Sequence, residues 1–131
     1  MIIKQLSVFI ENKEGRLETV TKVLAENDID IKTISLADTT EFGMLRLIVS
    51  DCDLAKKVLK EAGFAVNLTD VVAVKSINSA GYLHKLLAAL SSDITNIEYM
   101  YTLPSEDAPV LILKVSNPER IENILKAKNF A

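Results

Sequence analysis

The fold is decided by a short stretch that occurs twice, first as Glu11-Asn12-Lys13-Glu14-Gly15-Arg16-Leu17 and, 66 residues further on, as Ile77-Asn78-Ser79-Ala80-Gly81-Tyr82-Leu83. Each stretch follows an alternating apolar segment and precedes a segment with helical spacing, which predicts a loop from a strand into a helix. The same shift superimposes further identical residues without a gap: Leu24 on Leu90, Ile31 on Ile97, Leu45 on Leu111, Leu47 on Leu113, Val49 on Val115 and Phe64 on Phe130. The chain is therefore a repeat of two units of about 65 residues.

The first copy contains a complete set of predicted elements. Its strands are predicted at residues 5–10, 31–37, 42–50 and 65–68, and its helices at residues 17–24 and from Asp51 up to Gly63. The second helix is predicted to begin at Asp51. The order β-α-β-β-α-β predicts an α+β, ferredoxin-like fold, in which two helices cover one face of an antiparallel sheet.

The second copy repeats this order but lacks its last strand. Its strands are predicted at residues 71–76, 97–103 and 109–116, and its second helix follows Asn117 with Pro118 at the first helical position. We predict a first unit at 1–68 and a second at 69–131. A straight strand over residues 65–76 would measure about 40 Å, which is too long for one small sheet. We therefore expect a bend near residues 67–70.

Composition excludes several classes of protein. The chain has 131 residues, a net charge of −3 and a pI near 5.2, without the concentrated basic face on which nucleic-acid binding depends. No apolar run reaches the roughly 20 residues of a membrane span, and the first residues lack the pattern of a signal peptide. Cys52 and His84 are the only residues of their kinds, so we expect no disulfide, no metal site and no cofactor. A cytoplasmic protein is the expectation.

The repeated loop is the strongest candidate for a binding site. A helix N-terminus presents unpaired backbone N–H groups and a partial positive charge, and a glycine lets a guest approach the backbone closely. A carboxylate could be held there. The alternative is an ordinary capped loop, since Asn and Gly are common turn residues. Recurrence of Asn-x-x-Gly-x-Leu in the same structural context favours the binding role.

The repeated unit resembles the ACT domain, a small amino-acid-sensing regulatory module, and the whole chain is similar to stand-alone tandem ACT proteins. Glu14 and Ala80 replace the Pro that commonly precedes the loop glycine in that family. The resemblance implies a free amino acid bound between two units, against the glycine loop of one and the second strand of the other. Carried over by position, it implicates Asn12, Gly15, Arg16, Leu17, Ser35, Leu36, Asn78, Ala80, Gly81, Tyr82, Leu83, Tyr99, Met100 and Tyr101.

The two loops differ in chemistry. Lys13, Glu14 and Arg16 make the first loop charged, whereas Ser79, Ala80 and Tyr82 make the second smaller and more apolar. We expect the two sites to differ in affinity, or only one of them to bind.

These features predict a non-catalytic, amino-acid-binding regulatory protein that changes its shape or its association with a separate target protein. The first alternative is a small ferredoxin-like enzyme acting on a small metabolite, although none of the familiar catalytic motifs is present. The second is an RNA-recognition fold that would bind RNA through the strand at residues 42–46. The basic and aromatic motif expected of such a strand is only weakly present there.

We also predict a homodimer, because the second sheet lacks a strand. Without it, residues 71–76 would have one unpaired edge, and open edges invite pairing with another chain. The alternative is that the first unit of the same chain covers this edge.

Overall fold

The computed structural model describes residues 1–11, 13–38, 42–77, 79–91 and 96–130. It contains two compact units, which we describe separately. The first unit is Lys4–Thr69, and the second is Asp70–Ala131 together with Met1–Ile3. This division differs from the expected one at 1–68 and 69–131, because the first three residues lie with the second unit.

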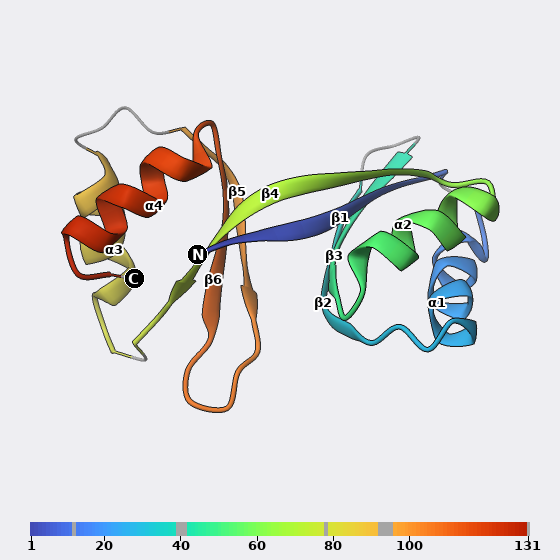
Figure 1. Cartoon of the computed structure of the whole chain (residues 1–131), viewed down its shortest axis with the longest axis horizontal. Helices are drawn as coiled ribbons and strands as arrows, with labels where there is room; N and C mark the ends of the chain where they lie inside the picture. Colours follow the sequence, from blue (N-terminus) through green and yellow to red (C-terminus); the bar gives the residue numbers. More distant parts are fainter. Residues whose placement is uncertain (12, 39–41, 78, 92–95, 131) are drawn as a thin grey trace. The chain divides into compact units, whose positions relative to one another are not determined.

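The first unit has the strand order of a ferredoxin-like sheet. Its elements are β1 (Ile2–Glu11), α1 (Arg16–Glu26), β2 (Ile31–Asp38), β3 (Phe42–Val49), α2 (Cys52–Glu61) and the first part of β4 (Ala65–Lys75). The strands are ordered β2-β3-β1-β4, with antiparallel pairing between β1 and β3 and between β2 and β3. Helices α1 and α2 lie on the same side of these strands (Figure 1).

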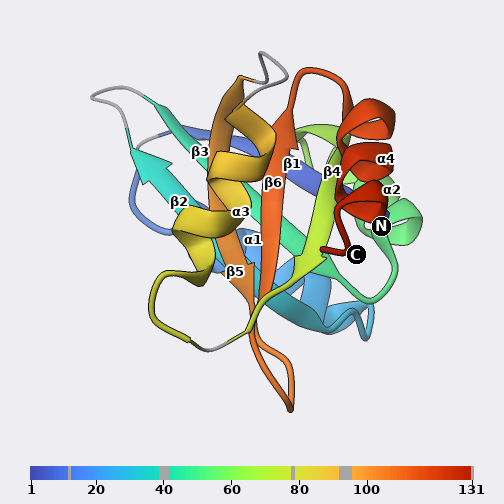
Figure 2. The same cartoon turned by 90° about the vertical axis from the view of Figure 1, so that its left-hand side faces the viewer.

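The second unit repeats this arrangement. It continues from β4 through α3 (Tyr82–Ser91), β5 (Ile97–Leu103), β6 (Val110–Val115) and α4 (Pro118–Ala127). The order is β4-β6-β5, and both pairings are antiparallel. Figure 2 looks onto the helices of this unit, with α3 and α4 on one face of the strands. In the described residues six strands and four helices thus form the predicted α+β, tandem ferredoxin-like fold.

The second helix of each unit starts directly after a residue whose side chain caps it. The Asp51 carboxylate accepts a hydrogen bond from the Leu54 backbone N–H at 3.1 Å, and the Asn117 side chain accepts one from Arg120 N–H at 3.2 Å. Each cap satisfies one of the unpaired N–H groups at the start of a helix. The predicted N-cap Asn117 is confirmed, and α2, which was expected to begin at Asp51, begins at Cys52 with Asp51 as its cap.

Each unit has its own apolar core. In the first, alternate residues of β1 and β3 pack against α1 and α2; in the second, β4 and β6 pack against α3 and α4. Equivalent leucines occupy equivalent places, such as Leu24 and Leu90, or Leu59 and Leu125, and all four are at most 2% exposed. The repeat in the sequence is therefore a repeat of packing as well.

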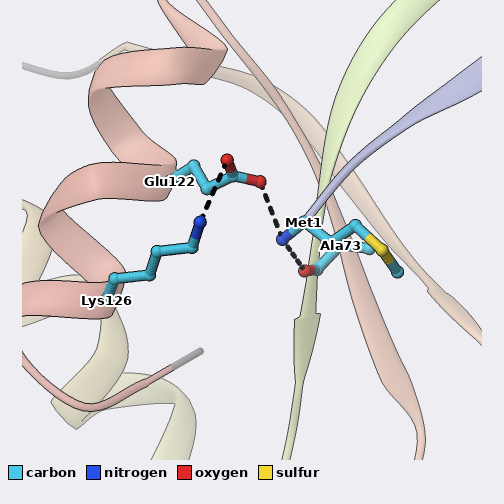
Figure 3. A network of polar contacts seen from close by, with 4 residues as sticks. All are labelled: Met1, Ala73, Glu122 and Lys126. Carbon is cyan, nitrogen blue, oxygen red and sulfur yellow. Dashed lines mark hydrogen bonds and ion pairs between the residues drawn. The ribbon is translucent and has the colours of Figure 1, made fainter.

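The edge that was expected to be open in the second unit is covered by the first residues of the chain. Ala73 N–H donates to Met1 O at 2.7 Å, and the Met1 amino group donates to Ala73 O at 3.0 Å, the exchange typical of an antiparallel pair. The same ammonium lies 3.3 Å from the Glu122 carboxylate on α4, and Lys126 lies 3.5 Å from that carboxylate (Figure 3). Met1–Ile3 therefore take the place of the missing fourth strand.

This arrangement corrects two expectations. Met1 pairs with Ala73 on this edge, so the argument for a homodimer from an unpaired edge at residues 71–76 is wrong and its alternative, coverage by the same chain, is right. The strands expected at residues 65–68 and 71–76 also form one continuous strand, because β4 runs from Ala65 to Lys75. Its length is accommodated because the unit boundary falls within it, between Thr69 and Asp70.

Candidate functional site

The two glycine loops have the same backbone geometry. Gly15 has φ +81° and Gly81 has φ +86°, in the left-handed region that favours glycine. Each glycine directly precedes a helix, and its carbonyl accepts the first helical hydrogen bond, from Thr19 N–H at 2.9 Å or Lys85 N–H at 3.0 Å.

The turn before each glycine is also repeated. Lys13 N–H donates to Glu11 O at 2.7 Å, and Ser79 N–H donates to Ile77 O at 2.8 Å. These four residues are related by the same shift of 66 positions as the glycines. The backbone of the loop is therefore independent of the side chains that it carries.

Each loop borders a small hollow. One residue of the second strand of the same unit, Leu36 of β2 or Thr102 of β5, also lines it. The first loop hollow, of about 130 Å³, is lined by Ile10, Glu11, Lys13, Arg16, Leu17, Leu36 and Gly43. The second loop hollow, of about 170 Å³, is lined by Ser76, Ile77, Ser79, Tyr82, Leu83, Thr102, Pro109 and Leu111. Every lining residue of the first hollow has its equivalent, 66 positions later, in the lining of the second. The two hollows are the same feature in two repeats.

The first loop hollow is charged. Lys13 lies 3.0 Å from the Glu11 carboxylate, and the hydrogen bond and charge of Lys13, aided by the charge of Arg16, hold the pKa of Glu11 below its ordinary value. The Arg16 guanidinium lies over the ring of Phe64, 4.3 Å from its centre. Glu11 is therefore ionised near neutral pH and faces two cations.

The second loop hollow replaces these charges with neutral groups. Tyr82 occupies the place of Arg16 and packs against Phe130, the equivalent of Phe64, with ring centres 6.1 Å apart. The Tyr82 hydroxyl donates to Lys75 O at 3.1 Å, so its polar atom is satisfied within the unit. In both units the first residue of the helix therefore contacts an aromatic ring at the same place. The contact is a cation on a ring in the first unit and a pair of rings in the second.

Arg16 also lines a second, larger hollow. This aromatic hollow, of about 300 Å³, is lined by Phe9, Ile10, Glu11, Arg16, Phe42, Gly63 and Ala65. Phe9 and Phe42 meet edge to face, with ring centres 6.3 Å apart. Glu11 and Arg16 line both this hollow and the first loop hollow.

Comparison with protein families decides the identity of the repeat. A family model described as an ACT domain pair matches residues 1–131. The chain belongs to the ACT domain pair family. The resemblance predicted from the loop motif and the element order is thereby confirmed.

Solved structures agree with this assignment. Protein BT0572 from Bacteroides thetaiotaomicron superposes with a TM-score of 0.92 at 44% sequence identity, over 98% of this chain and 90% of that one. The ligand-free regulatory subunit of aspartate kinase from Thermus thermophilus gives 0.70 at 20% identity, over 98% and 95%. The corresponding subunit from Thermus flavus gives 0.65 at 18% identity, over 97% and 92%. No curated protein matches the sequence.

The structure brings together some of the predicted site residues of the ACT pair. Arg16, Leu17 and Leu36 line the first loop hollow, and Tyr82 and Leu83 line the second. Gly15, Ala80 and Gly81 are exposed in the loops beside them. Asn12 and Asn78 lie outside the described residues.

Other predicted residues lie apart from the loop hollows. Ser35 pairs with Arg46 across β3, and Met100 packs against the core of the second unit. Tyr99 and Tyr101 stack on each other, with ring centres 6.4 Å apart. None of these four residues lines either loop hollow.

The sequence analysis missed several lining residues. In the first hollow these are Ile10, Glu11, Lys13 and Gly43, and in the second Ser76, Ile77, Ser79, Thr102, Pro109 and Leu111. The repeat itself could have found one of them, because the shift that relates the loops carries the predicted residue Leu36 onto Thr102.

Two kinds of feature are absent from the described residues. No helix there is both long and apolar enough to cross a bilayer. No three His, Cys, Asp or Glu side chains there lie close enough together to hold a metal ion.

Proposed function

We propose that this ACT domain pair is a non-catalytic regulatory protein of the cytoplasm that binds a free amino acid at its glycine loops. Binding changes its association with a separate target protein. The observation that carries the proposal is the equivalence of the two loop hollows, which recur with the same lining positions beside left-handed glycines. A feature retained through duplication while its side chains changed is expected of a ligand site that diversified, and less of a simple cap.

The proposal includes a second copy of the chain as a homodimer partner. At about 130 and 170 Å³ the loop hollows are smaller than the roughly 300 Å³ at which ligand pockets begin, so an amino acid would be only partly enclosed by one unit. Strand β2 ends the strand order, and Ile34 and Leu36 on it are 45% and 48% exposed. A second copy seated on this edge would cover apolar surface and close the hollow.

A thermal-shift screen of the twenty amino acids tests the ligand. A compound at 100 times its dissociation constant stabilises the folded state by about 2.7 kcal/mol, which raises the melting temperature measurably. We expect at least one amino acid to do so. Twenty flat curves, confirmed by calorimetry, would contradict the proposal.

Glycine variants then test the location of the site. At Gly15 or Gly81 a β-branched side chain disfavours the positive φ and would occupy the approach to the backbone, so Gly15→Val or Gly81→Val should abolish binding at its own loop. A Cβ at either glycine meets no atom within 4 Å, so the valine adds no steric clash and the strain is confined to the left-handed φ of the loop. Gly15→Asn and Gly81→Asn are the controls, because Asn tolerates the left-handed region. Binding that survives the double valine variant would place the site elsewhere.

Sedimentation equilibrium tests the partner. The chain has a mass of 14.4 kDa, so a dimer should sediment at twice that value. The variant Leu36→Lys, which charges the exposed edge, should shift the population toward monomer. A wild-type monomer at micromolar concentration, with and without ligand, would exclude the dimer.

A further inference from the structure

We infer that the first loop hollow selects a small dicarboxylate, with Arg16 as the residue that binds the second carboxylate. The inference rests on the proposed function, because it names the chemistry of the ligand at that same site. The first unit alone thereby prefers acidic ligands over neutral ones.

Arg16 is held in place before any ligand arrives. Its guanidinium lies 4.3 Å from the centre of the Phe64 ring, and Phe64 is itself buried at 4% exposure. A cation over an aromatic face is attracted by the ring, so the long side chain is restrained. Less conformational entropy is then lost when it binds an anion.

One nitrogen of this side chain lacks an acceptor. Arg16 Nε is buried and, in the described part of the chain, is the only buried side-chain nitrogen or oxygen without a hydrogen-bond partner. A buried donor without an acceptor is costly, and such groups in native proteins call for an explanation. Because Nε is closed off from solvent, a ligand can reach only the two terminal nitrogens of the guanidinium, which can donate a parallel pair of hydrogen bonds to the two oxygens of a carboxylate.

The charge balance of the hollow favours an anion. Glu11 is compensated by Lys13, 3.0 Å away, which leaves the charge of Arg16 in excess. The aromatic hollow shares Glu11 and Arg16 with the first loop hollow and adds about 300 Å³ next to the guanidinium. One carboxylate can thus lie at the glycine loop while a second, on the same molecule, reaches Arg16.

The second unit provides the internal comparison. Its hollow has Ile77, Ser79 and Tyr82 at the places of Glu11, Lys13 and Arg16, so none of the described residues that line it is charged. The Tyr82 hydroxyl is already bonded to Lys75 O. The preference for a second carboxylate therefore belongs to the first unit.

Isothermal titration calorimetry of the full chain at low salt tests this. The probes are aspartate and glutamate, their neutral counterparts asparagine and glutamine, and succinate, which has two carboxylates and no amino group. We expect the acidic amino acids to bind more tightly than the neutral ones. Arg16→Gln should weaken them at least about tenfold, the value of a charged hydrogen bond, and change the neutral ones little.

Two further variants separate charge from geometry. Arg16→Lys keeps the charge without the fork and should recover only part of the lost affinity. Lys22→Gln removes the same charge from an exposed position of the same helix, away from the hollow, and should leave affinity unchanged. Amide NMR shifts around Gly15, rather than Gly81, should report the acidic ligands.

The outcomes separate this inference from the proposed function. If neutral amino acids bind and acidic ones do not, or if Arg16→Gln has no effect, the dicarboxylate site is refuted while amino-acid binding stands. If succinate binds as tightly as aspartate and Arg16→Gln weakens both, the dicarboxylate site is supported and the amino-acid function is contradicted. Absence of any binding refutes both.

Discussion

The first and second glycine loops have the same backbone conformation and differ in the side chains around it. Gly15 and Gly81 adopt the same left-handed conformation and open helices through the same hydrogen bonds. Around them, Arg16 on Phe64 is replaced by Tyr82 on Phe130. The difference shows that the fold of the loop depends on its glycine and turn, which leaves the lining residues free to change the ligand.

The units also differ in how their sheets are completed. The first closes with β4, which belongs to its own repeat, whereas the second closes with Met1–Ile3 from the opposite end of the chain. The second unit therefore depends on residues that lie about 70 positions away from its first strand. Changes to the pairing of Met1–Ile3 should therefore alter the stability of the second unit and leave that of the first unit unchanged.

The largest expected effect tests whether the two cores are equivalent. Leu59 and Leu125 occupy the same place in α2 and α4 and are 0% and 2% exposed. Leu59→Ala and Leu125→Ala should each destabilise their own unit by about 2–5 kcal/mol, because a cavity is left in a packed core. Native-state hydrogen exchange, read separately for each unit, measures this.

Leu17→Ala is the control, because Leu17 is 39% exposed and borders the hollow rather than the core. Leu17→Ala should lower the free energy of unfolding by less than either core variant does. A core variant that left the exchange of its own unit unchanged would show that this unit is not held by its helices.

The elements of both units could be predicted from the sequence because their signals are local. Alternating apolar residues predicted the strands, and apolar residues at helical spacing predicted the helices. Asp51 and Asn117 indicated where two of the helices start. The strand that completes the second sheet could not be predicted in this way. Ile2 and Ile3 fit a strand of either unit, and nothing local in Met1 or Ala73 shows that their backbones pair 72 residues apart.

The next effect concerns Met1–Ile3, the residues that complete the sheet of the second unit. Ala73→Pro removes the N–H that donates to Met1 O, and a proline inside a sheet also distorts the strand. We expect a loss of about 3 kcal/mol, confined to the second unit. Hydrogen exchange of the amides of β4 and β6 measures it. Ala73→Ser keeps the N–H and should be nearly neutral, and equal protection in both variants would show that the Met1 pairing does not stabilise this unit.

The candidate site was predicted in part for the same reason. Arg16, Leu17, Tyr82 and Leu83 directly follow the loop glycines, so their place at the hollow follows from the motif. Thr102 enters the hollow through pairing of β5 with Leu111 of β6, a relation that becomes visible only with the register of the sheet. The stacking of Arg16 on Phe64 joins two elements 48 positions apart and has no local signal.

The smallest effect concerns a difference of charge between the two units. Glu122 of α4, which faces the Met1 ammonium at 3.3 Å, has Lys56 as its equivalent in α2. The hydrogen bond from that ammonium, together with the charge of Lys126, holds the pKa of Glu122 below its ordinary value. Because the folded-state pKa is lowered, the stabilisation is complete above about pH 4.3, the pKa in an unfolded chain, and is lost as the pH falls through the folded-state value.

Glu122→Gln should therefore lower the melting temperature at pH 7 by about 2 °C or less, since exposed ion pairs contribute little. The difference from wild type should shrink in high salt and disappear at a pH well below that of the unfolded carboxyl. Lys56→Gln is the matched control, because it changes the equivalent helix position where no chain terminus lies, and it should show no such pH dependence. If both variants responded alike to pH, the ion pair with Met1 would make no specific contribution, and the second unit would be held at its edge by the backbone hydrogen bonds to Ala73 alone.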